Sequence, residues 1–168
     1  TMAREVPSMA VRAGADSIEH GLFLTDDDLV LLGALRGSWV PTVVQMQATI
    51  DQLGERSSGG QLLLEGLDNV RANLGTAVEA GVHVLTGTDL AIGTHEVAQE
   101  AIRLWEMGMA AAQVVESVSR SGFRATGRPV GFEAGDPANA VMFSEDPVSN
   151  PRVLADPALV IRMGRIVS

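Results

Sequence analysis

Three glycines, Gly14, Gly37 and Gly81, each stand between a helical pattern and a short apolar run that ends in a polar residue. Glycine readily ends a helix because it adopts the left-handed conformation without a steric penalty, and an apolar run directly after it indicates a buried strand. Strands that alternate with helices form parallel sheets, because a parallel connection needs a long crossover. The sequence therefore predicts an α/β fold with three consecutive strand–helix units, in a parallel sheet or barrel, and not a helical bundle.

The hydropathy pattern places the elements of this repeat along the chain. The predicted strands cover residues 15–19, 39–44 and 82–89. Apolar residues that recur every three or four positions predict helices over residues 4–13, 25–35, 61–80, 95–107 and 110–121. Polar residues and a Ser-Ser-Gly-Gly cluster predict a long loop with a short helix over residues 45–60, of the kind that often forms a lid.

Beyond Gly122 the sequence changes character. Gly, Pro and Asp residues separate two strand-like runs at 140–143 and 159–163, and Gly164 suits the tight turn of a terminal hairpin. This pattern is typical of a small β appendage. We therefore predict two parts, an α/β domain over residues 1–126 and part of a small β domain over residues 127–168.

The composition restricts the partners and the chemistry. A net charge of −9 disfavours nucleic acid and anionic membranes, so small molecules are the expected partners. The chain has no Cys, and all twelve basic residues are Arg, so any metal must be held by His, Asp or Glu and no lysine chemistry arises here. No apolar run approaches the ~20 residues of a membrane span, and no signal segment opens the chain. A cytoplasmic location is expected.

Asp89 ends the third apolar run, and Gly87 two residues earlier predicts a turn or a close approach of the backbone to a ligand. The carboxyl ends of parallel strands are where catalytic residues collect, so Asp89 is a candidate metal ligand or base. The alternative is that Asp89 only caps the next helix.

His20 ends the first predicted strand in the same way. In a barrel both strand ends face one mouth, where an imidazole nitrogen and a carboxylate oxygen suit Zn²⁺. The alternative for His20 is a histidine that only hydrogen-bonds within the structure. His83 begins its strand, so we predict a packing role for it.

The ordered series of these segments resembles the amidohydrolase superfamily of metal-dependent hydrolases, nearest to its imidazolonepropionase-like and prolidase-like branch. The matching segments cover residues 16–21, 39–42, 85–89, 95–96, 107–109, 132–136 and 160–167. The resemblance extends over nearly the whole chain. It implies a (β/α)₈ TIM barrel with a small β-sandwich, of which this chain carries the C-terminal portion, from strand six to strand eight.

The resemblance also implies roles for individual residues. His20 is similar to the metal ligand of strand six, and Asp89 to the strand-eight aspartate that binds metal and takes the proton of the attacking water. The implied cofactor is a divalent metal, zinc above all, as one or two ions. His95 lies where many relatives keep a histidine near the pocket, which makes it a candidate contact to the substrate or to the metal ligands; the alternative is a neighbour of a helix N-cap.

Several parts of the family pattern have no counterpart here. These are the His-x-His pair of strand one, the lysine of strand four and the histidine of strand five. The first residues of the chain resemble the start of the helix after strand five, so we expect this chain to supply only part of a site.

The implied activity is hydrolysis of an amide-type C–N bond, in a dipeptide or a cyclic amide, by metal-activated water. One alternative is a non-catalytic fragment or assembly subunit that needs a complementary N-terminal segment, or a homo-oligomer, to cover its open strand edges. Another, within the same family, is a heterocycle deaminase.

Overall fold

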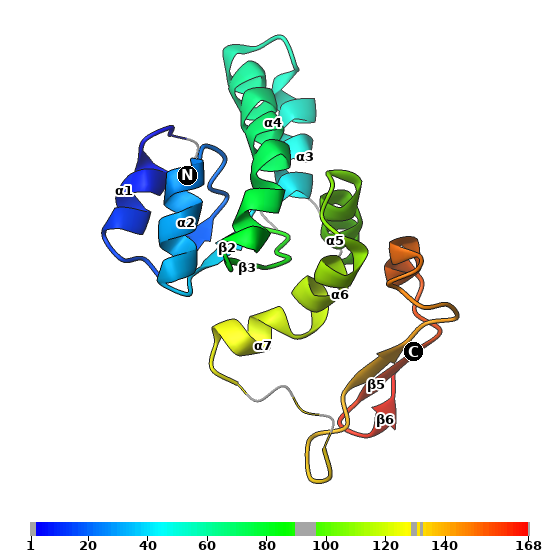
Figure 1. The fold of residues 1–168 in the computed structure, drawn as a ribbon. Coiled ribbons are helices and arrows are strands. Elements are labelled where there is room, and N and C mark those ends of the chain that lie inside the picture. Colours follow the sequence, from blue (N-terminus) through cyan, green and yellow to red (C-terminus); the bar gives the residue numbers. More distant parts are fainter. Residues whose placement is uncertain (1–2, 90–96, 129–130, 132, 168) are drawn as a thin grey trace.

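A computed structural model describes residues 3–89, 97–128, 131 and 133–167 of the chain (Figure 1). In these ranges the elements are α1 (Val6–Arg12), β1 (Ser17–Glu19), α2 (Asp26–Ala34), β2 (Ser38–Val40), α3 (Val43–Leu53), α4 (Ser58–Glu79), β3 (His83–Val84), α5 (Val97–Glu106), α6 (Ala111–Ser119), α7 (Ser121–Ala125), β4 (Ala140–Met142), the 3₁₀ helix η1 (Pro151–Ala155), β5 (Leu159–Arg162) and β6 (Arg165–Ile166).

The first three strands form a parallel sheet in the order β1-β2-β3, which confirms the predicted α/β class with consecutive strand–helix units. Trp39 on the middle strand lies opposite Ile18 on one side and Val84 on the other. All three side chains are buried. Because parallel strands run in the same direction, the residues that follow β1, β2 and β3 gather at one end of the sheet.

The tail forms the predicted β appendage, an antiparallel sheet in the order β4-β5-β6 that lies apart from the helices in Figure 1. Ala140 pairs with Ile161, and Arg162 pairs with Arg165 across the terminal turn. The 3₁₀ helix η1, which the sequence pattern did not reveal, packs against α5 and connects this sheet to the helices.

Two helix starts follow directly from the sequence. Thr25 accepts a hydrogen bond from the N–H of Asp28, whose carboxylate accepts one from the N–H of Thr25, so α2 begins with a capping box. Ser57 caps α4 by accepting from the N–H of Gly60. These side chains satisfy amide groups that have no partner within the helix.

The predicted strand over 39–44 and the predicted loop over 45–60 are both wrong in part. The strand ends at Val40, and the two β-branched residues Val43 and Val44 begin the helix α3 instead. The helix starts there because a carboxylate from a distant part of the chain binds its first amides, which no local pattern shows. The third strand is also shorter than predicted, because regular pairing covers only His83 and Val84.

The apolar core joins the sheet to the helices that cover it. Figure 1 shows α3 and α4 as an antiparallel helix pair beside β2 and β3. The helices α5 and α6 lie on the side of this pair that faces away from α1 and α2, and α5 contacts α3. The largest fully buried side chains are Trp39, Leu22, Leu24, Leu29, Leu32, Ile50, Leu63, Leu74, Leu104 and Glu100. A carboxylate among these apolar residues is unusual, since a buried charge needs hydrogen-bonding partners. In the part of the chain that the structure describes, no helix is long and apolar enough to cross a membrane.

Candidate functional site

Three residues that follow the three parallel strands share an unusual backbone conformation. His20, Thr42 and Asp89 have φ values of 66°, 54° and 41°, in the left-handed region that non-glycine residues rarely adopt. For Thr42 the conformation is especially unfavourable, because its side chain is β-branched. Strained backbone of this kind concentrates at functional sites and persists only where the surroundings hold it. The three strand ends therefore define a candidate site.

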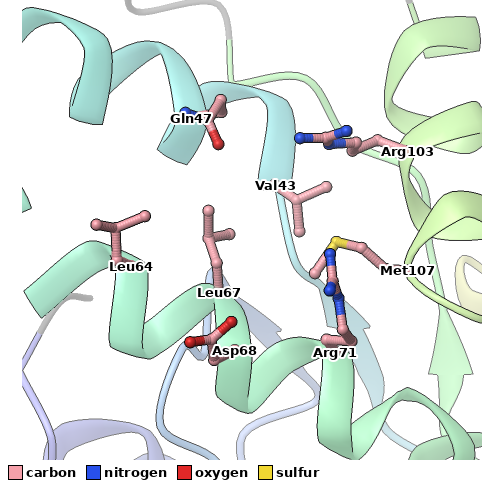
Figure 2. A pocket seen from close by; sticks show the side chains of 8 residues that line it. All are labelled: Val43, Gln47, Leu64, Leu67, Asp68, Arg71, Arg103 and Met107. Carbon is pink, nitrogen blue, oxygen red and sulfur yellow. The ribbon is translucent and has the colours of Figure 1, made fainter. Parts of the chain in front are cut away.

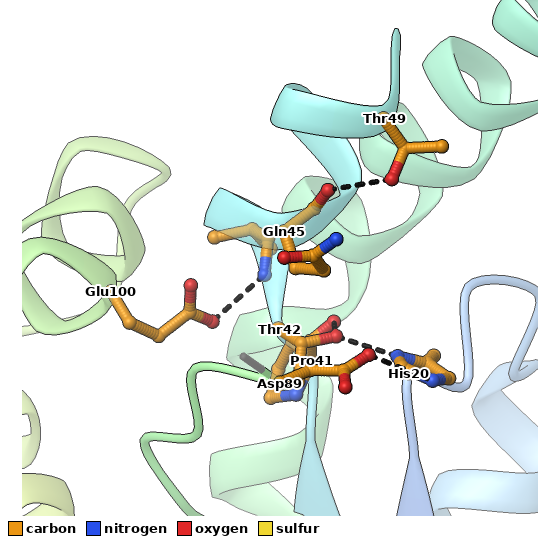
Figure 3. A network of polar contacts seen from close by, with 8 residues as sticks. His20, Pro41, Thr42, Gln45, Thr49, Asp89 and Glu100 are labelled. Atoms are coloured by element: carbon orange, nitrogen blue, oxygen red, sulfur yellow. Dashed lines mark hydrogen bonds and ion pairs between the residues drawn. The ribbon is translucent and has the colours of Figure 1, made fainter. Parts of the chain in front are cut away.

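His20 is held through one ring nitrogen. Its Nδ1 lies 2.7 Å from the Oγ1 of Thr42, and this hydroxyl in turn donates to the carbonyl oxygen of Pro41 at 2.7 Å (Figure 3). Since the hydroxyl proton of Thr42 is used on Pro41, the ring must donate from Nδ1. The neutral ring then carries its lone pair on Nε2, the form in which histidine binds a metal through Nε2.

The free nitrogen of His20 faces Asp89. Its Nε2 lies 3.6 Å from the Oδ2 of Asp89, and the two side chains are 24% and 40% exposed. Burial lowers the pKa of His20 below its usual value, while the carboxylate of Asp89 partly opposes this effect. Burial therefore favours the neutral form of His20, which is the form that binds a metal.

The two side chains fit a metal ion in both chemistry and spacing. Imidazole nitrogen and carboxylate oxygen are standard zinc ligands, and two ligands of one tetrahedral zinc ion lie about 3.4 Å apart because each bond is about 2.1 Å long. The structure thus brings together the two residues that the sequence analysis assigned to metal binding. Within residues 3–89, 97–128, 131 and 133–167, no cluster of three or more His, Asp or Glu side chains could hold a metal ion.

Trp39 and Gly87 shape the backbone around this pair. The Nε1 of Trp39 donates to the carbonyl oxygen of His20 at 2.9 Å, which holds the left-handed turn after β1. A Cβ atom added at Gly87 would lie 2.4 Å from the Cγ1 of Val40. Gly87, two residues before Asp89, therefore allows the segment after β3 to lie close to Val40 at the end of β2.

Glu100 is a site residue that sequence reasoning missed. Its side chain is 0% exposed, and its two carboxylate oxygens accept hydrogen bonds from the N–H groups of Val43 and Val44, both at 2.8 Å. Figure 3 shows Glu100 with one of these two bonds. Burial raises the pKa of Glu100 to about 7, and the hydrogen bonds from the first amides of α3 oppose that rise. The sequence did contain a signal for this residue: Glu100 stands at helical spacing from apolar residues, three positions after Val97 and four before Leu104.

Gln45 directly follows Val44 in α3 and was missed as well. It is 2% exposed, and its Oε1 is a buried acceptor without a hydrogen-bond partner among the described residues. A buried acceptor of this kind is costly unless a donor completes it, and Gln45 lies only three residues after Thr42 along the chain.

The remaining predicted residues take different places. His95 lies outside the described residues. His83 begins β3, as predicted, and pairs with Ser38 at the opposite end of the strand from Asp89. The predicted packing role of His83 agrees with this position.

A shallow pocket between α3, α4 and α5 lies away from His20 and Asp89. Figure 2 shows its lining, which consists of Val43, Gln47, Leu64, Leu67, Asp68, Arg71, Arg103 and Met107. Of these lining residues, Val43 alone also takes part in the contacts described above, through its backbone N–H group. We therefore locate the candidate site at the ends of β1, β2 and β3.

Comparisons with solved structures show which known proteins share this fold. The chain is similar to a Xaa-Pro dipeptidase with bound methionine in its active site, with a TM-score of 0.79, 22% identity, and coverage of 98% of this chain and 43% of that one. It is also similar to a prolidase complexed with N-methylphosphonate-L-proline, with a TM-score of 0.80, 20% identity, and coverage of 99% and 43%. At this level of identity the likeness shows the fold, an α/β fold shared with hydrolases of the TIM-barrel type.

Sequence comparison gives the family. The profile of the amidohydrolase family matches residues 5–167, and the chain therefore belongs to the amidohydrolase family. An uncharacterized protein of Mycobacterium bovis (strain ATCC BAA-935 / AF2122/97) is 31% identical over 160 residues, which are 92% of this chain and 43% of that protein. The chain thus spans less than half the length of this relative and of both solved structures.

Proposed function

We propose that this chain forms part of a metal-dependent hydrolase that cleaves an amide-type C–N bond, in a dipeptide or a cyclic amide, with water as the nucleophile. The observation that carries the proposal is the 3.6 Å approach of His20 Nε2 and Asp89 Oδ2 at the carboxyl ends of β1 and β3, in a chain of the amidohydrolase family. The likeness to a Xaa-Pro dipeptidase and a prolidase favours a dipeptide over a cyclic amide.

His20 and Asp89 are the residues of this chain that would hold the metal, which we propose to be zinc. When bound, such an ion lowers the pKa of a water molecule toward ~7 and so supplies a nucleophile at neutral pH. His20 contributes the Nε2 lone pair that the Thr42 contact leaves free. Asp89 contributes a carboxylate oxygen to the same position.

Asp89 has a second role in this proposal, that of the proton acceptor. Water must lose a proton as its oxygen attacks the substrate carbonyl, and the leaving nitrogen must gain one as the C–N bond breaks. The carboxylate of Asp89 accepts the first proton and returns it to the leaving amine, so the proton balance closes on one side chain. Its 40% exposure leaves room for water and substrate beside it.

The test is made on the complete protein that contains this chain, with a panel of Xaa-Pro and other dipeptides. Asp89→Asn keeps the shape of the side chain and removes its basicity, so kcat is expected to fall by about 10²–10⁴-fold. His20→Ala is expected to lower zinc content as well as rate, whereas His83→Gln, at the far end of β3, leaves both unchanged. Full activity of Asp89→Asn refutes the proposed role of Asp89.

A second candidate function is favoured by the sheet itself. Among the described residues β1 and β3 are the edges of the three-stranded sheet, and His20 and Asp89 are two metal ligands where catalytic zinc sites usually have three. In this alternative the chain is an assembly subunit that acts only with a complementary segment or as a homo-oligomer. Purified chain that contains no zinc and elutes as a dimer or larger species supports this alternative, and a zinc-loaded monomer refutes it.

A further inference from the structure

Glu100 connects α5 to the beginning of α3. Its Oε1 and Oε2 each accept one hydrogen bond, from the N–H groups of Val43 and Val44, at 2.8 Å. These are the first two amides of α3, which have no partner within the helix. Glu100 therefore caps this helix from another part of the chain, and a carboxylate accepts such bonds more strongly than a neutral oxygen does.

This arrangement changes what Thr42 can do. A threonine at the N-cap position normally turns its hydroxyl oxygen toward the N–H groups of the helix that it precedes. Thr42 makes no such bond, and Glu100 already accepts from the first two of these groups, the N–H groups of Val43 and Val44. The Oγ1 of Thr42 is left free to accept from the Nδ1 of His20, while its proton goes to Pro41.

The backbone of Thr42 supports the same conclusion. An N-cap residue usually has an extended conformation, as Thr25 and Ser57 do in this chain, whereas Thr42 has φ 54° and ψ 43°. A left-handed threonine relaxes to the extended form unless its surroundings prevent it. The two hydrogen bonds that Glu100 accepts fix the amides directly after Thr42 and so help to hold this conformation.

We propose that Glu100 is a positioning residue for the metal site: by capping α3 it releases the hydroxyl of Thr42, which then holds His20 with its proton on Nδ1 and its lone pair on Nε2. The proposal rests on the proposed function in so far as Nε2 is meant for a metal. The state of the His20 ring, however, can be measured without metal and without a substrate.

The first experiment measures the ring state of His20 by long-range ¹H–¹⁵N NMR of the full chain at a pH where its imidazole is neutral. The chain has three histidines, so the signals can be assigned by single replacements. Glu100→Gln keeps the shape and one acceptor oxygen. We expect the wild-type protein to show His20 protonated on Nδ1, and Glu100→Gln to show a mixture with a substantial Nε2-protonated fraction.

Asp28→Asn is the matched control. Asp28 is also a buried carboxylate, 2% exposed, that caps a helix, but its partners are Thr25 and Ser8 and not the site. Asp28→Asn is expected to lower stability and leave the His20 spectrum unchanged. An unchanged His20 spectrum in Glu100→Gln, or an equal change in Asp28→Asn, overturns the proposal.

Thr42→Val and Thr42→Ser provide a route that leaves Glu100 intact. Thr42→Val removes the hydroxyl at constant shape, so it must produce the same change in the His20 ring as Glu100→Gln does. Thr42→Ser keeps the hydroxyl, so it must show the wild-type spectrum. Adding Glu100→Gln to Thr42→Val must then have no further effect on His20. A further change in the double variant shows that Glu100 does not act through Thr42 and refutes the proposal.

Zinc affinity supplies the final readout. Residues that orient a metal ligand change affinity by about 10–100-fold when they are replaced, so Glu100→Gln of the complete protein is expected to raise the Kd for Zn²⁺ by about 10-fold, while Asp28→Asn leaves it unchanged. An equal Kd in wild type and Glu100→Gln overturns the proposal. If the wild-type protein itself binds no zinc, the proposed function fails, and the NMR result alone decides the role of Glu100.

Discussion

The close contact between Gly87 and Val40 gives a quantitative prediction. Gly87 has no positive φ, so its backbone accepts alanine, and among the described residues the obstacle is the Cγ1 of Val40 at 2.4 Å from the new Cβ atom. Ordinary contact begins at about 3.4 Å, so the strands must separate by about 1 Å, and overpacking of this kind costs about 1–3 kcal/mol. Since Gly→Ala also restricts the unfolded chain by about 0.4–1 kcal/mol, Gly87→Ala is expected to destabilise the protein by about 1–2 kcal/mol.

The effect of Gly87→Ala on the free energy of unfolding should change sign when Val40 is replaced by alanine. In Val40→Ala the atom at 2.4 Å is absent, and the next neighbours of the new Cβ are the Cγ2 of Thr42 at 3.8 Å and the Cβ of residue 40 at 3.9 Å. Gly87→Ala is then expected to be neutral or to stabilise by up to about 1 kcal/mol. The coupling free energy between the two positions is therefore about 2 kcal/mol.

The assay is urea unfolding of the four proteins of this cycle, followed by the fluorescence of buried Trp39. Gly75→Ala is the control, because Gly75 lies in α4 and no other described part of the chain comes within 4 Å of its Cβ position. It is expected to stabilise both backgrounds equally, by about 0.5–1 kcal/mol. If the effects of Gly87→Ala and Val40→Ala simply add, the contact does not restrict residue 87 and the reasoning is refuted.

Three further predictions concern single side chains. Because burial raises the pKa of Glu100 from 4.5 to about 7, the folded state binds its proton more tightly than the unfolded state does, so stability should fall as pH rises through this window. Relative to Glu100→Gln, unfolding at a series of pH values should show wild type losing about 3 kcal/mol between pH 4 and pH 8; parallel profiles contradict this. Trp39→Phe removes the hydrogen bond to the His20 carbonyl and also part of a fully buried ring system, so it should cost at least about 1 kcal/mol in urea unfolding, and no loss would show that this bond contributes nothing. Arg152→Ala breaks an exposed ion pair with Glu106, so it should cost less than 1 kcal/mol, and the loss should shrink further in 1 M salt, measured as a change in Tm; a larger loss that salt does not reduce contradicts a surface ion pair.

The parts of the fold that local patterns determine could be predicted from the sequence. The parallel strands could be located because each follows a glycine and contains apolar residues. The start of α2 was visible in Thr25 and the acidic residues after it, which complete a capping box within four positions. His20 and Asp89 were paired correctly in space, because parallel strands bring their carboxyl ends together.

The parts that depend on contacts between distant residues could not be predicted. The helix α3 was missed because Val43 and Val44 favour a strand, and the residue that reverses this preference, Glu100, lies 57 and 56 positions away along the chain. The contact of Thr42 with His20 was missed for the same reason, since it depends on α3 beginning at residue 43. Local propensity was overridden at the site itself, where function most often requires such exceptions.

The left-handed conformations of His20, Thr42 and Asp89 have a consequence for protein engineering. At each of these positions Gly or Asn would relieve backbone strain of about 1–3 kcal/mol. A library selected for thermal resistance alone would therefore enrich replacements at these three positions and discard the residues that the site needs. Directed evolution of this chain should hold the three positions fixed, or select for the proposed zinc binding together with heat resistance.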